Sequence, residues 1–178
     1  NFAVGGILEV VKNVHSRHQL GKLGSETLLS YFTQKFGLPT STEFGIAQMK
    51  FAESAAAYAV VCYLMWVKDR HNGNILIDEE GHAIHIDFGF LLGISPGGNL
   101  GFETSAFKFS REMVALLGGL KSRCFKYFLT VATRGFLIAR QYMSMLITIV
   151  GSFADSGLPC FMYKLNTLES LKSRFFAD

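Results

Sequence analysis

The stretch that most constrains the fold is residues 68–89, which place five acidic side chains around two short apolar runs. The runs, Asn74–Ile77 and His82–Ile86, are rich in β-branched residues, and the four residues between them end in a glycine. This pattern predicts a β-hairpin. We expect Ile77 to lie opposite His82, and this pairing fixes the register of both strands.

Side-chain alternation in that register places the polar residues on one face of the hairpin. The isoleucines of both strands would point to a core, while Asn74, His85 and Asp87 would share the opposite face. Asn74 and Asp87 would then be diagonal neighbours, close enough for both to bind one ion. Amide and carboxylate oxygens are hard ligands that suit Mg²⁺ better than zinc. We therefore predict that Asn74 and Asp87 bind a divalent metal and that His85 supports this site through a hydrogen bond.

A second motif precedes the hairpin. Asp69 lies five residues before Asn74, and Asp87 begins an Asp-Phe-Gly triplet. An Asp and an Asn at this spacing, followed by Asp-Phe-Gly, occur in kinases that transfer a phosphoryl group. Here the chain reads Asp-Arg-His from Asp69, whereas common protein kinases carry His before Arg and Asp.

The order of these motifs resembles the phosphatidylinositol 3-/4-kinase superfamily. Within it, residues 67–74, 99–108 and 158–161 are similar to type III phosphatidylinositol 4-kinases. The beta form is the closer match, although residues 95–101 look more like the alpha form. The resemblance covers nearly the whole chain.

This resemblance implies an α+β fold, namely the mostly helical carboxyl-terminal lobe of a bilobal, protein-kinase-like catalytic domain. Residues 1–178 would then follow the hinge between the lobes and stop before the closing helices. No candidate is found in this chain for the phosphate-covering loop and the strand lysine of the amino-terminal lobe. We therefore expect the chain by itself not to be a competent enzyme.

The implied activity is transfer of the ATP γ-phosphate to the 4-hydroxyl of phosphatidylinositol, with Mg²⁺, or Mn²⁺, as the metal. Two residues are candidates for the base that orients the inositol hydroxyl: Asp69 by its spacing, and His71 by its place in the superfamily motif. The sequence does not choose between them. We expect Arg70 to pair with an acidic neighbour and so hold this catalytic loop.

Residues 88–109 follow the hairpin and are rich in glycine. By resemblance they form the activation loop, and their only charges are Glu103 and Lys108. Kinases of this superfamily that accept phosphorylated inositol headgroups carry several basic residues there. A nearly neutral loop therefore suits unphosphorylated phosphatidylinositol, with Lys108 as the contact to the lipid phosphate. An ordinary exposed loop lysine explains Lys108 equally well.

Charge is unevenly distributed. The chain has a net charge of +3, too small to indicate nucleic acid, yet residues 108–140 hold seven basic residues and one acid. Such a stretch suits an anionic surface, although a solvated helix face explains it equally well. Two alternatives to a lipid kinase follow: a serine/threonine protein kinase of the same superfamily, and a fragment that only docks on membranes or adaptors.

The cellular setting follows from composition and resemblance. Three dispersed cysteines indicate neither disulfides nor zinc, which favours a reducing cytosol. The uncharged run at residues 54–67 has 14 residues, fewer than the ~18 that a membrane span needs. We expect a peripheral protein on the cytosolic face of the Golgi or plasma membrane, and the resemblance implies a small GTPase or Golgi adaptor as partner.

Local patterns predict the remaining elements. They are a strand at residues 7–11, a helix capped by Ser25 and ended by Gly37, a long helix capped by Thr42 and reaching Trp66, a short helix capped by Ser110 and stopped at Gly118, and helices at residues 122–133, at 136–153 and from Thr167.

Overall fold

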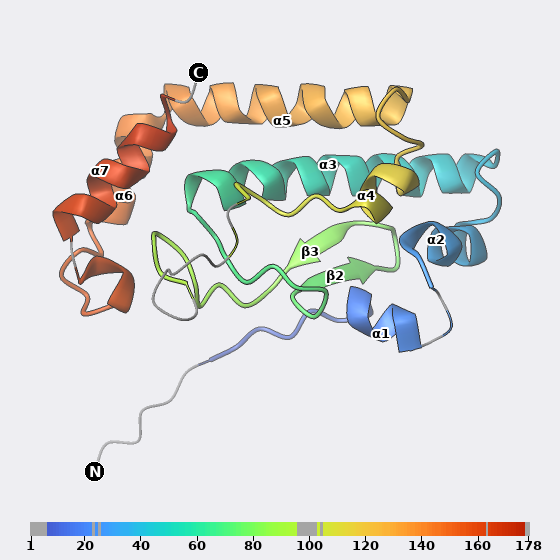
Figure 1. Ribbon diagram of the computed structural model, residues 1–178, viewed down its shortest axis with the longest axis horizontal. Coiled ribbons are helices and arrows are strands. Elements are labelled where there is room, and N and C mark those ends of the chain that lie inside the picture. The colour runs from blue at the N-terminus through green and yellow to red at the C-terminus, as the bar shows by residue number, and fades with distance from the viewer. Residues whose placement is uncertain are drawn as a thin grey trace, which may run out of the picture.

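The computed structural model describes residues 7–22, 24, 26–95, 103, 105–162 and 164–176. Its elements, in chain order, are β1 Val14–Ser16, α1 Arg17–Lys22, α2 Leu28–Phe36, α3 Thr42–Leu64, β2 Ile75–Asp78, β3 Ala83–His85, α4 Arg111–Leu116, α5 Arg123–Gln141, α6 Met143–Gly151, the 3-10 turn η1 Pro159–Phe161 and α7 Lys164–Arg174. In Figure 1, α5 lies along one edge of the molecule, α3 runs beside it, and the hairpin of β2 and β3 lies beyond α3. The expected α+β class, mostly helical, is confirmed.

The predicted hairpin forms, but its predicted register is wrong by one residue. Ile77 pairs with Ala83 rather than with His82. The loop has three residues rather than four, because Asp78 and His82 already pair through the backbone, at 3.1 Å from Asp78 N to His82 O. Gly81, at φ 97°, supplies the left-handed residue that a three-residue hairpin loop needs.

The new register changes which side chains share a face. Ile75 and Ile77 lie on the same face as Ala83 and His85, and all four are buried. The predicted grouping of all the isoleucines on one face is therefore wrong. His85 points toward the core with them, rather than to the opposite face with Asn74.

The first strand is β1, which pairs antiparallel with β2 and gives the sheet order β1-β2-β3. The predicted strand at residues 7–11 is wrong. Residues 7–12 have no regular structure, and the side chains of Ile7, Leu8 and Val10 are highly exposed. An apolar run becomes a strand only where a partner strand meets it, and β1 meets β2 from Val14 onward.

Two helix caps differ from their predictions. Thr27 caps α2, with its hydroxyl accepting from Ser30 N–H at 3.1 Å, while the predicted cap Ser25 lies outside the described residues. Ser41, not Thr42, caps α3 by accepting from Phe44 N–H at 3.2 Å. Adjacent hydroxyl residues are interchangeable as caps in a sequence, so only the backbone geometry decides between them.

The boundaries of some later helices also differ from those predicted. Ser110 caps α4 as predicted, and Gly118 follows it at φ 83°. The predicted break between residues 133 and 136 is wrong, because α5 continues through Gly135 to Gln141. α3 packs along α5 and stabilises the turns around this glycine. The last helix begins at Lys164, three residues before the predicted Thr167.

The core has two parts. The larger one joins α2, α3, α4, α5 and the sheet, with Phe32, Phe44 and Phe51 fully buried at its centre. The smaller one joins the end of α3 to α6 and α7 around Leu171 and Phe175. Aromatic side chains of this size dominate core energetics, so residues 65–74, which carry the predicted catalytic residues, leave α3 from a rigid base.

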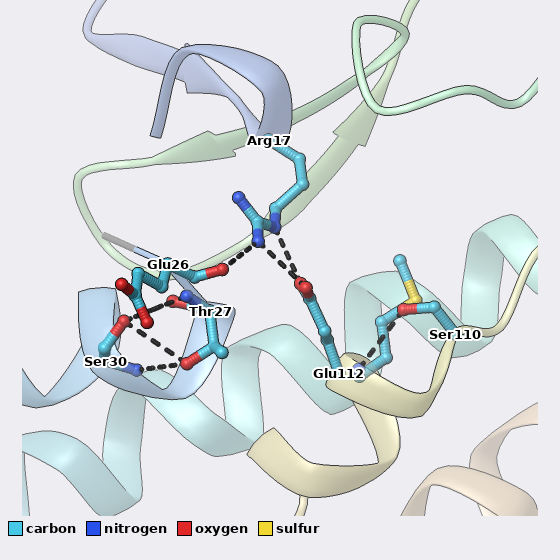
Figure 2. Close-up of polar contacts among 7 residues, drawn as sticks. Arg17, Glu26, Thr27, Ser30, Ser110 and Glu112 are labelled. Carbon is cyan, nitrogen blue, oxygen red and sulfur yellow. Dashed lines mark hydrogen bonds and ion pairs between the residues drawn. The ribbon is translucent and has the colours of Figure 1, made fainter. Parts of the chain in front are cut away.

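A partly buried ion pair joins α4 to Arg17, which directly follows β1. Figure 2 shows Arg17 between Glu112 and Glu26. Its guanidinium donates to the two carboxylate oxygens of Glu112 at 2.7 and 2.9 Å, and to the backbone carbonyl of Glu26 at 2.7 Å. Because α4 directly follows the predicted activation loop, this pair fixes the point where that loop ends.

Candidate active site

Two segments that carry the predicted motifs lie side by side. Residues 65–74 return from α3 to the sheet as a loop beside the segment that follows β3. Lys68 N–H donates to Phe90 O at 2.8 Å, and Leu92 N–H donates to Met65 O at 2.8 Å. The Asp-Arg-His motif and the Asp-Phe-Gly motif are therefore brought together by backbone hydrogen bonds.

Arg70 joins these segments from the interior. The residue is 1% exposed, and its guanidinium donates to the backbone carbonyls of Lys68 at 2.9 Å, of Ile86 at 2.7 Å and of Asp87. It also lies over the ring of Phe88, 5.4 Å from the centroid. The expected pairing with an acidic neighbour is wrong, because backbone carbonyls take that place. A planar fork of five donors suits carbonyls that converge from two segments.

Asn74 is buried at the start of β2. Its backbone carbonyl accepts from Ile86 N–H at 3.1 Å, and its side-chain nitrogen Nδ2 donates to Asp69 O at 2.9 Å. Because Nδ2 is held in this way, the side-chain oxygen Oδ1 is directed away from the Asp69 carbonyl. Asn74 thus presents an oxygen, rather than a donor, as its remaining polar atom.

Asp87 is exposed and has a left-handed backbone, at φ 58°. Its Oδ1 accepts from Gly89 N–H at 3.3 Å. This conformation interrupts strand alternation, so the alternation argument that put Asn74 and Asp87 on one face does not hold. The link that the structure shows is instead the backbone bond from Ile86 N–H to Asn74 O, which places the residue before Asp87 beside Asn74.

Asp69 and His71 form a second polar pair in the same loop. His71 Nε2 lies 3.9 Å from Asp69 Oδ2, and Nδ1 accepts from Gly73 N–H at 3.0 Å. A Cβ at residue 73 would lie 2.8 Å from His71 Cε1, so the ring can fold back in this way only over a glycine. A neutral ring that accepts at Nδ1 carries its proton on Nε2, which faces Asp69.

The other acids of the motif stretch belong to the hairpin turn. Asp78 Oδ1 accepts from the backbone of Glu80 and His82, and Glu80 pairs with Lys50 of α3. These carboxylates stand at the opposite end of the hairpin from Asn74. Of the five acidic residues in this stretch, three therefore lie in the hairpin turn, and only Asp69 and Asp87 lie at the candidate site.

His85 lies away from the predicted metal ligands. Its ring stacks on Tyr58 with centroids 4.3 Å apart, and Nδ1 lies 3.6 Å from Cys62 Sγ. Burial, assisted by the charge of Arg70, lowers the pKa of His85 to about 4. Within the described residues it makes no hydrogen bond to Asn74 or Asp87, so the predicted supporting bond is not found.

Sequence reasoning missed Lys68 and the role of Glu103. Lys68 Nζ donates to the backbone carbonyls of Glu103 at 2.7 Å and Ser105 at 3.1 Å, while Glu103 Oε2 accepts from Asp69 N–H at 3.0 Å. Burial lowers the pKa of Lys68, and Glu103 opposes this effect. The signal in the sequence that could have found Lys68 is its position, a charged residue soon after the apolar second half of the long helix. These bonds tie the predicted activation loop to the catalytic loop.

Lys108 is exposed and lines two pockets beside the catalytic loop. One, of about 280 Å³, also includes Arg70, Ser105 and Ser110, and the other, of about 260 Å³, also includes Asn72. Of the predicted loop 88–109, residues 96–102 and 104 lie outside the described residues. Lys108 is thus placed where a ligand beside the catalytic loop would meet it.

The backbone of this region is strained. Six non-glycine residues among those described have positive φ values. Five of them lie in or beside the two motif segments or contact them, namely Trp66, Asp69, Asp87, Leu92 and Glu103, and the sixth, Asn13, precedes β1. Each such conformation costs about 1–3 kcal/mol and persists only where surrounding contacts enforce it. Strain of this kind is typical of functional sites.

Comparison with known proteins identifies the family. A family model described as phosphatidylinositol 3- and 4-kinase matches residues 5–163. The chain belongs to this family. It is 48% identical over 171 residues to phosphatidylinositol 4-kinase beta of Xenopus laevis, covering 96% of this chain and 21% of that protein. Against the Rattus norvegicus phosphatidylinositol 4-kinase beta, identity is 48% over 174 residues, covering 97% and 21%.

A phosphatidylinositol 4-kinase of Dictyostelium discoideum is 44% identical over 177 residues, covering 98% of this chain and 15% of that protein. The chain therefore spans about a fifth or less of the length of these curated relatives. The resemblance predicted from Asp-Arg-His and Asp-Phe-Gly is confirmed. The helical architecture is consistent with the helical lobe of a kinase-like domain. Within the described residues, no helix combines the length and apolar character needed to cross a bilayer.

Proposed function

We propose that these residues act in a lipid kinase that transfers the γ-phosphoryl group of ATP to the 4-hydroxyl of phosphatidylinositol. In this proposal residues 1–178 form the carboxyl-terminal lobe of the catalytic domain, and ATP is shared with an amino-terminal lobe. The relatives support it, since each is named a phosphatidylinositol 4-kinase. The preference for the 4-hydroxyl rests on those names alone.

The observation that carries the proposal is the clamp made by Arg70. Phosphoryl transfer needs little covalent chemistry and depends on positioning and on neutralising charge. Arg70 fixes the backbone of both motif segments at Lys68, Ile86 and Asp87. One buried cation thus sets the relative position of the two loops that a kinase needs beside its phosphates.

The donor chemistry of Asn74 and Asp87 fits Mg²⁺. Within the described residues no three His, Cys, Asp or Glu side chains gather as a metal site, so the protein would supply only a few ligands. Mg²⁺ accepts such a site, because it usually keeps waters and substrate phosphates as its other ligands. In the proposal Asn74 Oδ1 and the Asp87 carboxylate hold the ion, which when bound neutralises phosphate charge. Mn²⁺ would serve in the same way.

Asp69 and His71 share the task of orienting the attacking hydroxyl. The bond from Gly73 N–H occupies His71 Nδ1, so Nε2 carries the proton and the Asp69 carboxylate keeps free lone pairs. This arrangement favours Asp69 as the group that accepts the hydroxyl proton. His71 would steady the Asp69 charge, and Lys108 would contact the lipid phosphate.

The test compares wild-type full-length protein with Asp87→Asn. We expect the wild type to label phosphatidylinositol vesicles from ATP in the presence of Mg²⁺, and the variant to lose this turnover while its far-UV circular dichroism is unchanged. Glu79→Gln is a matched control, because Glu79 is an exposed acid in the hairpin turn. It should retain full activity.

Two results would refute the proposal. Phosphate transferred to peptides and not to lipid would make the protein a serine/threonine kinase of the same superfamily. Activity retained by Asp87→Asn would refute the metal assignment, whichever substrate is labelled.

A further inference from the structure

Helix α7 packs against the two segments that carry the motifs. Its side chains Leu171 and Phe175 are buried, and they share the smaller core with Leu64 and Leu92. Leu64 is the last residue of α3, directly before the loop of residues 65–74, and Leu92 lies three residues after the Asp-Phe-Gly triplet. One cluster therefore joins α7 to the start of the predicted catalytic loop and to the segment that follows β3.

Arg174 of α7 adds a polar contact at the same place. Its Nη1 donates to the backbone carbonyl of Tyr63 at 2.8 Å, and its guanidinium lies over the ring of Trp66, 4.2 Å from the centroid. Tyr63 belongs to the last turn of α3, where carbonyls lack their regular helical partners and a nearby cation is favourable. Arg174 therefore fixes the point at which α3 ends and the predicted catalytic loop begins.

Trp66 is the strained residue of this junction. Its backbone is left-handed, at φ 49°, a conformation that a bulky residue adopts only where surrounding contacts enforce it. Directly before it, Met65 O accepts from Leu92 N–H at 2.8 Å. Two residues after it, Lys68 N–H donates to Phe90 O at 2.8 Å. Trp66 thus lies between two backbone bonds that join the motif segments.

The ring of Trp66 is contacted from both motif segments and from α7. Lys68 Nζ lies 5.8 Å from its centroid, and a Cβ added at Gly93 would lie 3.6 Å from its Cζ3. A cation within about 6 Å of an aromatic ring is attracted to it. Arg174 is the closer of these two cations and comes from a different helix. Without Arg174, the strained Trp66 would lose a contact that originates outside the two motif segments.

We propose that Arg174 is a positioning residue for phosphoryl transfer. By holding Trp66 in its left-handed conformation, it sets the place of the predicted catalytic loop against the Asp-Phe-Gly segment. This inference rests on the proposed function. In the described part of the chain Arg174 makes no hydrogen bond or ion pair with the groups proposed to act on the substrate, so it acts through the loop that carries Asp69 and Asn74. Displacing such groups slows turnover more than it weakens binding.

The experiment measures steady-state kinetics of the full-length protein with ATP and phosphatidylinositol vesicles. Arg174→Met keeps the side-chain stem but removes the cation and its donors. We expect kcat to fall about 10- to 100-fold while KM for ATP and for lipid changes less than about threefold, with far-UV circular dichroism unchanged. Arg174→Lys returns a cation to the ring and should recover much of the lost kcat. Lys172→Met is the matched control on the same helix, because Lys172 is exposed, and it should keep kcat within about twofold of wild type.

A double variant tests whether Arg174 acts through Trp66. Trp66→Leu removes the ring that the guanidinium contacts. Arg174→Met/Trp66→Leu should then lower kcat no further than the larger of the two single effects, because both substitutions break the same contact. A loss equal to the product of the single effects would show that the two residues act independently and would overturn the proposal.

Hydrogen exchange separates this inference from the proposed function, because it needs no substrate. The amides of Lys68 and Leu92, which bond across the junction, should exchange at least about tenfold faster in Arg174→Met than in Lys172→Met. A wild type that labels no lipid would refute the proposed function whatever the exchange shows. With an active wild type, a normal kcat in Arg174→Met, an equal loss in Lys172→Met or unchanged exchange would overturn the role of Arg174 alone.

Discussion

Replacing Arg70 with Met should destabilise the protein more than any exposed substitution. Methionine keeps the length and apolar stem of the side chain but removes every donor. Three backbone carbonyls, those of Lys68, Ile86 and Asp87, then lose a charge-assisted hydrogen bond. A buried acceptor left unpaired costs about 1–3 kcal/mol. The Asp87 carbonyl belongs to an exposed residue that water can reach, so only the two other carbonyls count in full, and we expect a loss of about 2–6 kcal/mol.

Equilibrium urea unfolding, followed by far-UV circular dichroism, measures this loss. With an m-value of about 2 kcal/mol/M, the midpoint should fall by roughly 1–3 M. Arg70→Lys should fall between the wild type and Arg70→Met, because an ammonium group has no planar fork and cannot reach three carbonyls at once. Arg111→Met is the matched control, since Arg111 is exposed.

A small effect would refute the reasoning. If Arg70→Met lost less than about 1 kcal/mol, or no more than Arg111→Met, water would have to replace the guanidinium at all three carbonyls. Arg70 would then not hold the two motif segments together.

Two further predictions concern stability. The pKa of His85 falls from 6.5 unfolded to about 4 folded, so stability is full above pH 6.5 and is lost as pH falls toward 4, because the unfolded state binds the proton first. His85→Phe keeps the stacked ring but removes the titrating group. The unfolding free energies at pH 7 and pH 4.5, measured in urea with a chelator, should therefore differ by about 2–3 kcal/mol less in the variant than in the wild type. An unchanged difference would contradict the argument that burial lowers the pKa of His85. Arg17→Met should lower the unfolding free energy by about 1–2 kcal/mol in the same assay. The loss is smaller than for a fully buried ion pair, because the Glu112 side chain is 37% exposed. A loss near zero would show that solvent fully screens the pair.

Short-range patterns predicted the elements well, and their pairing less well. The hairpin, the cap at Ser110 and the long helix α3 follow from residues within a few positions of each other, whereas α5 was predicted with a break that it does not have. The register failed because a three-residue and a four-residue loop both fit the letters before Gly81. A shift of one residue then turned His85 from the site to the core, as period-two alternation requires.

Long-range contacts could not be predicted from spacing. Arg17 and Glu112 are 95 residues apart, and Arg174 reaches back 111 residues to the Tyr63 carbonyl. The residues around Arg17 and Arg174 in the sequence do not indicate which distant residue each one binds. The composition of residues 68–89 indicated one dense acidic site, whereas in the fold Asp78 and the acids that follow it form the hairpin turn. Motif order was the more robust signal, because it reflects chemistry rather than local geometry.

Arg70 also explains how a strained site can persist. Asp69 and Asp87 both adopt left-handed backbones, which together cost about 2–6 kcal/mol. Arg70 binds the carbonyl just before Asp69 and the carbonyl of Asp87 itself, so its hydrogen bonds act on the backbone at both strained positions. Arg70 thus acts on the backbone at both aspartates and occupies neither carboxylate. A carboxylate partner for Arg70, as the sequence suggested, would have consumed one of them.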